Sequence, residues 1–366
     1  MDLYEIFLYD NVYNKLNNNG LIGFITSNSY YTSKSFENLR KYIIENTHIL
    51  EIIDFPFRFF PFEDVNTETS IILLKKTNLS NKLLSKFSTI SKQKLNNTLT
   101  IDDNVKINIK TLFQNEIKVF FDNKIIIKQS DVLIKLLQCK MKLGNYLELH
   151  KGWMSIPKTT IVNEDVIEQG IFTKNEIDTY QIKTICHKYL EGRDTHRYYI
   201  DNVEKYVNIE NIDSKTKTWH FADKIILQRI VGQNKNKIFA TYDNENHIIF
   251  PNANLVNTLV KEYDIRFFLA ILNSTLISYF YNLYFGESNT NLTKLAFESI
   301  PIVDIEKTIK EPFIQKADLM LELNKKSQET KQNFHHELKL EKLTTKLQKF
   351  ENLEFDDFIK EYTKSK

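Results

Sequence analysis

Three short apolar runs in the first 76 residues have the character of β-strands, and this small number of strands constrains the fold more than any other feature. The runs cover 21–26, 48–55 and 69–76, with the sequences "LIGFIT", "HILEIIDF" and "TSIILLKK". Apolar residues recur at helical spacing in 3–16 and in 33–46, "SKSFENLRKYIIEN". The order helix, strand, helix, strand, loop, strand predicts a fragment of a βαβ sheet whose last two strands are antiparallel.

Such a fragment leaves a physical problem unsolved. Three apolar strands and two helices cannot bury both faces of a sheet and also protect its edge. The strand at 21–26 would keep an open central edge, so further strands must come from later sequence or from another polypeptide. Residues 80–130 do alternate between apolar and polar side chains, but they are typical of a peripheral antiparallel ribbon.

The remaining sequence changes character at about residue 131. It predicts a helix that ends near Gly144, then an irregular β-rich region of short strands and turns, and one buried helix at 265–285. The last segment is helical and charged, with an apolar seam for packing against a neighbour that consists of Phe334, Leu338, Leu347 and Phe350. We therefore expect three parts, with boundaries at 1–130, 131–302 and 303–366.

Composition excludes several classes of protein. The chain of 366 residues is 42% apolar and has a net charge of only +2, so a nucleic-acid contact would have to use local basic patches. The two cysteines form no cluster with ligand spacing. No stretch approaches the roughly 20 apolar residues that cross a bilayer, and "MDLYEIFLYD" is not a signal peptide. These features predict a soluble cytoplasmic protein without a membrane partner.

A loop rich in phenylalanine precedes the third predicted strand. The segment 54–70, "DFPFRFFPFEDVNTETS", contains five phenylalanines, although loops usually keep large aromatic side chains away from solvent. Most of these rings are best interpreted as a hydrophobic plug beneath the loop. The alternative is that Phe60 or Phe62 presents its face to a planar ligand such as a base, and stacking of that kind contributes about 1–3 kcal/mol per base.

Several catalytic motifs are missing from the sequence. The eight glycines are scattered singly, so no strand is followed by the Gly-rich turn that a dinucleotide or S-adenosylmethionine site requires. No NPPY-type or DPPY-type tetrapeptide occurs, and the histidines lack carboxylate or cysteine partners at metal spacing. We expect neither catalytic residues nor a metal site in this chain.

Basic and aromatic residues instead cluster in three segments of the β-rich region. These are "HKGWMSIPK" (150–158), "EGRDTHRYY" (191–199) and "QRIVGQNKNK" (228–237). Each alone would more often be a solvated charged loop, but three in one region favour a face that reads nucleic acid. The candidate DNA-binding residues are Lys151, Trp153, Arg193, His196, Arg197, Arg229, Asn234 and Lys235.

Taken together, these segments resemble adenine-specific DNA methyltransferases of the gamma class, including the TaqI-type enzymes. Residues 1–76 resemble the part that follows the catalytic tetrapeptide, through "NNNGLIGFITSNSYYTS", "LRKYIIEN", "ILEIIDF" and "PFEDVNTETSIILLKK". Residues 132–302 resemble the TaqI-like target-recognition domain, through "LGNYLELHKGW", "YLEGRDTHRY", "KIILQRIVG" and "FLAILNSTLISYFY". The individual motifs are degenerate, but their order is specific.

The resemblance implies a fold class and site residues. The fold would be an α/β, partial Rossmann-like methyltransferase sheet with only its last three strands, followed by an irregular β-rich α+β target-recognition domain and C-terminal helices. In such enzymes the flipped adenine lies against an aromatic ring on the loop before the final strand. Alignment on Thr69 places Phe62 there, with Phe60 as a register-shifted rival. Ser27 and Asn28 would line the cofactor and base cleft.

The function that follows is that of an incomplete enzyme. The chain would be the carboxy-terminal half of a split or truncated N6-adenine DNA methyltransferase, and S-adenosylmethionine would bind only through an amino-terminal partner half. Its other expected partner is double-stranded DNA, and a restriction endonuclease is a further candidate. The alternatives are a DNA specificity subunit of a restriction-modification complex and an inactive remnant of a disrupted gene.

Overall fold

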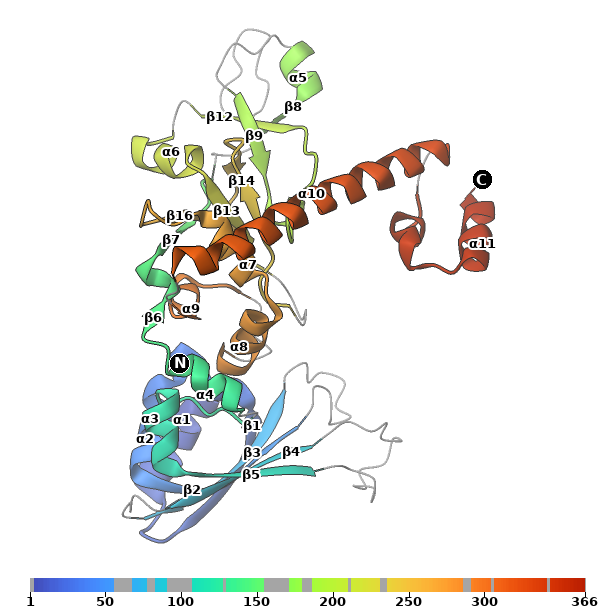
Figure 1. The fold of residues 1–366 in the computed structure, drawn as a ribbon. Helices are drawn as coiled ribbons and strands as arrows, with labels where there is room; N and C mark the ends of the chain where they lie inside the picture. Colours follow the sequence, from blue (N-terminus) through green and yellow to red (C-terminus); the bar gives the residue numbers. More distant parts are fainter. Residues whose placement is uncertain are drawn as a thin grey trace, which may run out of the picture.

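The computed structural model describes most of the chain, as a mixed α/β structure with several sheets (Figure 1). The described residues are 3–55, 68–77, 83–90, 107–127, 130–154, 171–179, 186–209, 212–230, 236–285, 291–303, 306–340 and 343–365. None of the helices in these ranges is both long enough and apolar enough to span a membrane.

The first sheet has five strands in the order β1-β3-β2-β4-β5. Strands β1 and β2 each pair with β3 in antiparallel orientation, so β1 and β2 are parallel to one another. All three predicted strands are confirmed, and their bounds are Leu21–Ser27, Thr47–Asp54 and Thr69–Lys76. Strands β4 (Leu84–Ile90) and β5 (Ile107–Phe113) pair antiparallel at one end of this sheet, as the predicted peripheral ribbon would. The prediction missed that β4 also pairs with β2 in parallel, so the sheet has five strands in the described residues.

Helices cover one face of this sheet (Figure 1). They are α1 (Leu3–Asp10), which continues as one π-helical turn over Asn11–Lys15, α2 (Glu37–Asn46) and α3 (Gln114–Phe121). Residues of all three helices join side chains from alternate strand positions in one core, among them Leu8, Ile43, Ile52, Ile72, Phe87 and Ile117. The period of two along each strand directs the remaining side chains to the opposite face.

That opposite face is apolar near β1 and polar near β4. One cross-strand row runs through Ile25, Ile71, Ile53, Ser88 and Ile109. Ile25 is 55% exposed, and Leu21, four residues earlier on the same face of β1, is 67% exposed. Among the residues that the structure describes, no helix covers this part of the sheet.

Strand β1 is also the end of the sheet. In the described ranges its only pairing partner is β3, so its other edge presents unpaired backbone groups. Within the described residues, β1 thus has the open edge that the sequence predicted, although the sheet has five strands and not three.

Two further four-stranded sheets form the β-rich part. One has the order β14-β13-β16-β7, with bounds Ala240–Asp243, Lys224–Gln228, Ala253–Thr258 and Leu147–Lys151. The other has the order β15-β9-β12-β8, with bounds Ile248–Ile249, Cys186–Leu190, Lys205–Asn208 and Ile171–Thr173. The remaining short elements here are the pair β10 (Thr195–His196) and β11 (Tyr199–Ile200), α5 (Lys174–Thr179) and α6 (Ser214–Phe221).

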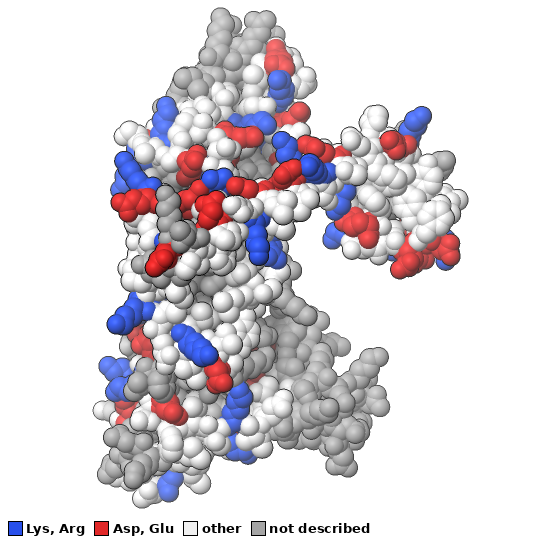
Figure 2. Space-filling model, in the orientation of Figure 1, with Lys and Arg blue, Asp and Glu red and all other residues white. Residues whose placement is uncertain are grey.

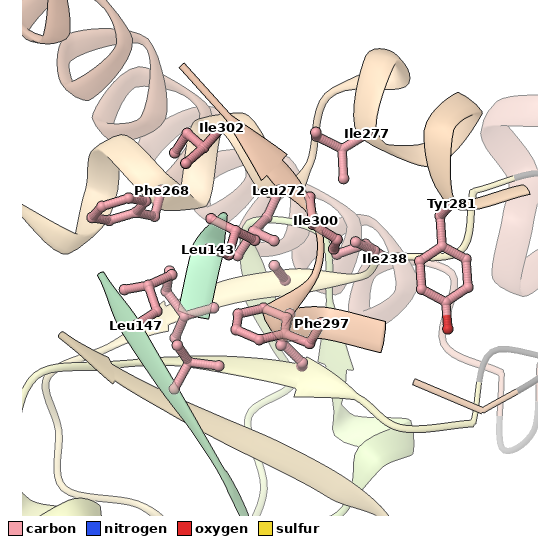
Figure 3. Packing of buried hydrophobic residues seen from close by; sticks show 14 of the residues in the cluster. Leu143, Leu147, Ile238, Phe268, Leu272, Ile277, Tyr281, Phe297, Ile300 and Ile302 are labelled. Carbon is pink, nitrogen blue, oxygen red and sulfur yellow. The ribbon is translucent and has the colours of Figure 1, made fainter. Parts of the chain in front are cut away.

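The largest hydrophobic core lies beneath the first of these sheets. Figure 3 shows Leu147 of β7, Phe268 and Leu272 of α7, and Phe297 of α9 pointing toward one another in this core. The helices that enclose it are α7 (Ile265–Leu272), α8 (Thr275–Phe285) and α9 (Lys294–Glu298).

Two predicted helices have wrong limits. The helix expected to end near Gly144 is α4 (Asp131–Leu137), since the chain then forms β6 (Met141–Lys142), which pairs with β17 (Pro301–Ile302). The single helix expected at 265–285 is two helices, α7 and α8. Asn273 interrupts it, because its buried side-chain amide forms hydrogen bonds with both the N–H and the C=O of Ala240.

The C-terminal region is helical, as expected. Helix α10 (Lys307–Glu337) packs on α7, where the Arg266 guanidinium binds both carboxylate oxygens of Asp318 at 3.0 and 2.9 Å. Its far end projects from the body toward α11 (Phe355–Ser365) (Figure 1). The apolar seam is used within this region, since the Phe334 and Phe350 ring centroids are 4.4 Å apart.

Candidate functional site

A cavity of about 750 Å³ lies between the first sheet and the β-rich part. Its walls include Asn28, at the carboxyl end of β1, and Asp54, at the end of β2, as well as Tyr284 and Thr293 from the other side of the molecule. Pockets that bind small ligands commonly have volumes of about 300–1,000 Å³. The cavity is therefore large enough for a nucleotide-sized group, and it lies at the strand ends where α/β sheets bind ligands.

Asn28 is the centre of a polar cluster in this cavity. Its side-chain amide donates to a carboxylate oxygen of Glu68 at 3.0 Å and to one of Asp54 at 3.3 Å. Its backbone N–H also donates to the Glu68 carbonyl at 3.1 Å. The sequence pattern identified Asn28 but missed both carboxylates, since their proximity depends on the pairing of β1 with β3. Ser27, predicted beside Asn28, is not part of the cavity wall, and its hydroxyl accepts from the Ser29 N–H.

The turn after β1 is held by a buried arginine. The Arg40 guanidinium donates to the carbonyls of Tyr30, Ser33 and Asn123 at 2.9, 2.6 and 3.0 Å. Burial lowers the pKa of Arg40 to about 10. These bonds fix the turn of the first domain against the segment that follows α3, because one guanidinium binds the Tyr30 and Ser33 carbonyls of the turn and the Asn123 carbonyl of that segment.

Lys124 lies in the segment that follows α3, and its side chain also lines the cavity. Its ammonium nitrogen lies 3.4 Å from the ring centroid of Tyr284 and 4.9 Å from that of Phe285, both at the end of α8. The Thr32 hydroxyl donates to the Phe285 carbonyl at 2.9 Å. Together these contacts join the first domain to the β-rich part.

On the β-rich side, the three basic and aromatic segments predicted from the sequence all contact one turn, 249–252. The Trp153 N–H donates to the Ile249 carbonyl at 2.8 Å, and the Gly192 N–H donates to the Asn252 side chain at 2.7 Å. The Arg229 guanidinium donates to the Pro251 carbonyl at 3.2 Å. The structure thus brings together segments that are far apart in the sequence.

Two glycines permit this convergence. A Cβ atom on Gly152 would lie 2.4 Å from the Ile249 carbonyl oxygen, and one on Gly192 would lie 2.6 Å from the Asn252 carbonyl oxygen. Real Cβ atoms do not approach backbone this closely. The "HKGW" and "EGRD" motifs therefore contain glycine because the turn packs directly against both loops.

The predicted DNA-binding side chains have different environments. Lys151 is exposed, and Arg193 is largely exposed beside Glu191, with a nitrogen–oxygen distance of 2.7 Å. The His196 ring lies 2.9 Å from Asp201, and this hydrogen bond raises the pKa of His196 despite partial burial. Arg197 instead points inward and donates to the Asn273 carbonyl.

The other predicted site residues lie outside the described ranges. These are Phe60 and Phe62 of the aromatic loop, and Asn234 and Lys235 of the third basic segment.

The surface charge is mixed rather than uniformly basic. Figure 2 shows Lys and Arg interspersed with Asp and Glu along α10, without a large patch of one sign on this face. In the part of the chain that the structure describes, no group of three or more His, Cys, Asp or Glu side chains is arranged to hold a metal ion.

Three protein families match parts of the chain. The TaqI-like C-terminal specificity domain matches residues 187–302, and the Eco57I restriction-modification methylase matches residues 1–60. Residues 306–366 match a domain of unknown function. The chain is thus related to the TaqI-like methyltransferases and carries a TaqI-like specificity domain, which confirms the resemblance stated from the sequence.

Individual relatives agree with this relationship. A protein of Methanocaldococcus jannaschii, named as the type II restriction enzyme and methyltransferase RM.MjaORFECS2P, is 27% identical over 338 residues, which cover 87% of this chain. The match spans only 26% of the length of that relative.

Among solved structures, the type IIL restriction-modification enzyme MmeI, in complex with DNA, shares the fold with a TM-score of 0.54 at 11% identity. That match covers 89% of this chain and 45% of MmeI. The type ISP restriction-modification enzyme LlaGI matches with a TM-score of 0.44 and 13% identity over 85% of this chain and 30% of LlaGI.

Proposed function

We propose that this chain forms the base-pocket wall and the DNA-reading part of an N6-adenine DNA methyltransferase from a restriction-modification system. The methyl-donor loop and the NPPY-type tetrapeptide would belong to a completing section, on a separate subunit or elsewhere in a longer polypeptide. The families matched at residues 1–60 and 187–302 support a methylase segment followed by a specificity domain.

The uncovered face and edge of the first sheet carry this proposal. One edge of strand β1 has no pairing partner among the described residues, and the apolar side chains nearest to that edge, Leu21 and Ile25, are more than half exposed. The face becomes polar further from the edge, where Glu51 pairs with Lys86 at 2.9 Å and accepts from Ser88. This gradient is expected if strands and helices of a completing section cover β1 and its neighbours but not β4.

S-adenosylmethionine, when bound by the completing section, would supply the methyl group. The role of this chain would be to hold the substrate base. Asn28 and the carboxylates of Asp54 and Glu68 provide polar groups in the cavity, and Phe62, or Phe60 in a shifted register, would stack on the flipped adenine. Flipping costs a few kcal/mol of lost stacking, which a parallel aromatic ring partly offsets.

Reading of the DNA sequence would depend on loops around the turn 249–252. Arg193 and Lys151 are exposed there and can reach base edges or phosphates. A restriction endonuclease remains a candidate partner, in keeping with the relative named as both a restriction enzyme and a methyltransferase.

Methyl transfer by a reconstituted complex tests the proposal. The chain would be produced alone, together with the product of the neighbouring upstream reading frame, and that product alone, each with labelled S-adenosylmethionine and double-stranded DNA. Incorporation at adenine only in the mixture is the expected result. DNA binding without methyl transfer in any combination would instead indicate a specificity subunit, and neither activity would indicate an inactive remnant.

A further inference from the structure

Lys124 places a positive charge on the wall of the cavity, and no carboxylate of the described residues forms an ion pair with it. Its ammonium lies over the rings of Tyr284 and Phe285, and it forms no ion pair with any residue that the structure describes. A cation–π contact supplies only part of the solvation that an ammonium loses on burial. An anionic ligand bound next to Lys124 would therefore stabilise the charged form of its side chain.

Other charges surround Lys124 but do not neutralise it. Burial lowers its pKa to about 7. The carboxylates of Asp122 and Glu37 act in the opposite direction, while the positive charges of Arg40 and Lys34 add to the effect of burial. Arg40 is occupied by three backbone carbonyls, and Lys34 pairs with Glu37, so neither competes with Lys124 for a ligand in the cavity.

We propose that the Lys124 ammonium binds a backbone phosphodiester of the DNA strand that enters the cavity between the two domains. This inference rests on the proposed function and assigns one contact within it. The same cavity contains the Asn28 cluster, which would face the flipped base, so one nucleotide could be held at both its base and its phosphate. A phosphodiester keeps its negative charge at every relevant pH, and a lysine is a suitable point-charge partner for it.

Proton uptake is a consequence that distinguishes this contact from an ordinary surface lysine. Below pH 7 Lys124 is already protonated, whereas above pH 7 the phosphodiester binds only if a proton is taken up. DNA affinity should then fall by up to about tenfold per pH unit above 7, because binding is linked to one proton. Arginine remains charged throughout this range, so Lys124→Arg should remove that dependence.

The test measures the affinity of the full chain for a short duplex against salt and against pH. Lys124→Met should weaken binding about tenfold and lower the slope of log Kd against log salt by about 0.9, the value for one lost phosphate contact. The matched control is Lys118→Met, on α3 of the same domain, where the ammonium is exposed and pairs with Glu45. An unchanged salt slope and pH dependence in Lys124→Met, or equal changes in the control, would overturn the assignment.

A second measurement separates this site from the proposed function. In a chain with ¹³C-labelled lysine, the Lys124 resonance is identified by its loss in Lys124→Arg and titrated with and without a short single-stranded oligonucleotide. A raised pKa of Lys124 supports the phosphate site even if the duplex does not bind, an outcome that would count against the recognition function alone. An unchanged titration overturns the site, as does an equal shift with pyrophosphate, which would indicate a pocket for free phosphate.

Discussion

Lys224 and Asp243 form a completely buried ion pair in the specificity domain. The distance from the ammonium nitrogen to the carboxylate oxygen is 2.5 Å, and His247 forms a hydrogen bond with the other carboxylate oxygen at 2.7 Å. The Lys224 ammonium also donates to the His220 carbonyl. Burial by itself would raise the pKa of Asp243, but the His247 hydrogen bond and the Lys224 charge lower it to about 2.

Asp243→Asn should lower the free energy of unfolding by about 3–5 kcal/mol, because it leaves the Lys224 ammonium buried without a countercharge. The double variant Lys224→Met, Asp243→Leu should recover most of this loss, since it removes both charges. Urea denaturation measures both effects. As a control, Lys118→Met breaks an exposed pair and should cost no more than about 1 kcal/mol. An equal loss in all three variants would contradict the prediction.

The same carboxylate makes stability depend on acid pH. The folded-state pKa of Asp243 lies below its ordinary value of 3.8, so the ionised form stabilises the fold above about pH 4. This contribution is lost as pH falls from about 4 through 2. Denaturant midpoints measured across that range should fall more steeply for the parent chain than for Asp243→Asn. Parallel curves would show that Asp243 titrates normally.

Two neighbouring arginines should respond differently to substitution. Arg193→Ala should weaken DNA binding and reduce the salt slope by about 1, because its guanidinium is largely exposed. Arg197→Ala should preserve the salt slope and lower stability by about 1–3 kcal/mol, since it removes the donor to the buried Asn273 carbonyl. Fluorescence anisotropy at several salt concentrations, with urea denaturation beside it, separates the two outcomes. A reduced salt slope for Arg197→Ala would restore its predicted role in binding.

At the level of elements, the exposed cross-strand row on the first sheet allows one edge of the sheet to be compared with the other. Ile25 and Ile109 occupy the same cross-strand row at opposite edges and are 55% and 56% exposed. Ile25→Glu should leave the isolated chain folded and weaken association with the completing section by about ten- to a hundredfold, as expected when burial worth about 1.5–3 kcal/mol is lost. Ile109→Glu should have no effect on association. Titration calorimetry measures the two affinities, and equal affinities of the Ile25→Glu and Ile109→Glu variants for the completing section would show that the interface lies elsewhere.

The break between α7 and α8 gives a second prediction at this level. Asn273→Ala removes two buried hydrogen bonds to Ala240 of β14, at 3.1 and 2.9 Å. The Ala240 carbonyl keeps a second donor, the Tyr198 N–H at 2.9 Å, so only the Ala240 N–H is left unpaired. An unpaired buried backbone group costs about 1–3 kcal/mol, and the specificity domain should lose stability in that range. Asn273→Asp, which retains one acceptor, should lose less. Hydrogen exchange at Ala240 reports the effect directly, and unchanged protection would contradict it.

The elements of the first sheet were predictable because their apolar periodicity matches their burial. All three predicted strands form at the expected positions, within one or two residues. The α7–α8 break was not predictable, because apolar spacing continues through 265–285 and the cause is a contact with distant Ala240. The parallel pairing of β4 with β2 was also missed, since alternation does not reveal which strand is the neighbour.

Across the whole molecule, the families and the basic loops could be inferred from the sequence, but the cavity could not. Its walls combine Asn28, Lys124 and Thr293, which come from three distant parts of the chain. Lys124 carries no sequence signal, because its importance comes from burial against α8. The turn at 249–252 was missed for a similar reason, since it accepts hydrogen bonds from loops that begin more than twenty residues away in the sequence.

The unpaired edge of β1 also has a consequence for how cells would handle the protein. Among the described residues no strand covers this edge, and an open strand flanked by apolar side chains is a template for unwanted pairing. Under the proposed function, chains without the completing section should therefore aggregate or be degraded. Simultaneous synthesis of both sections would prevent this. If the proposed function holds, incomplete molecules would then be removed before they could bind DNA without modifying it.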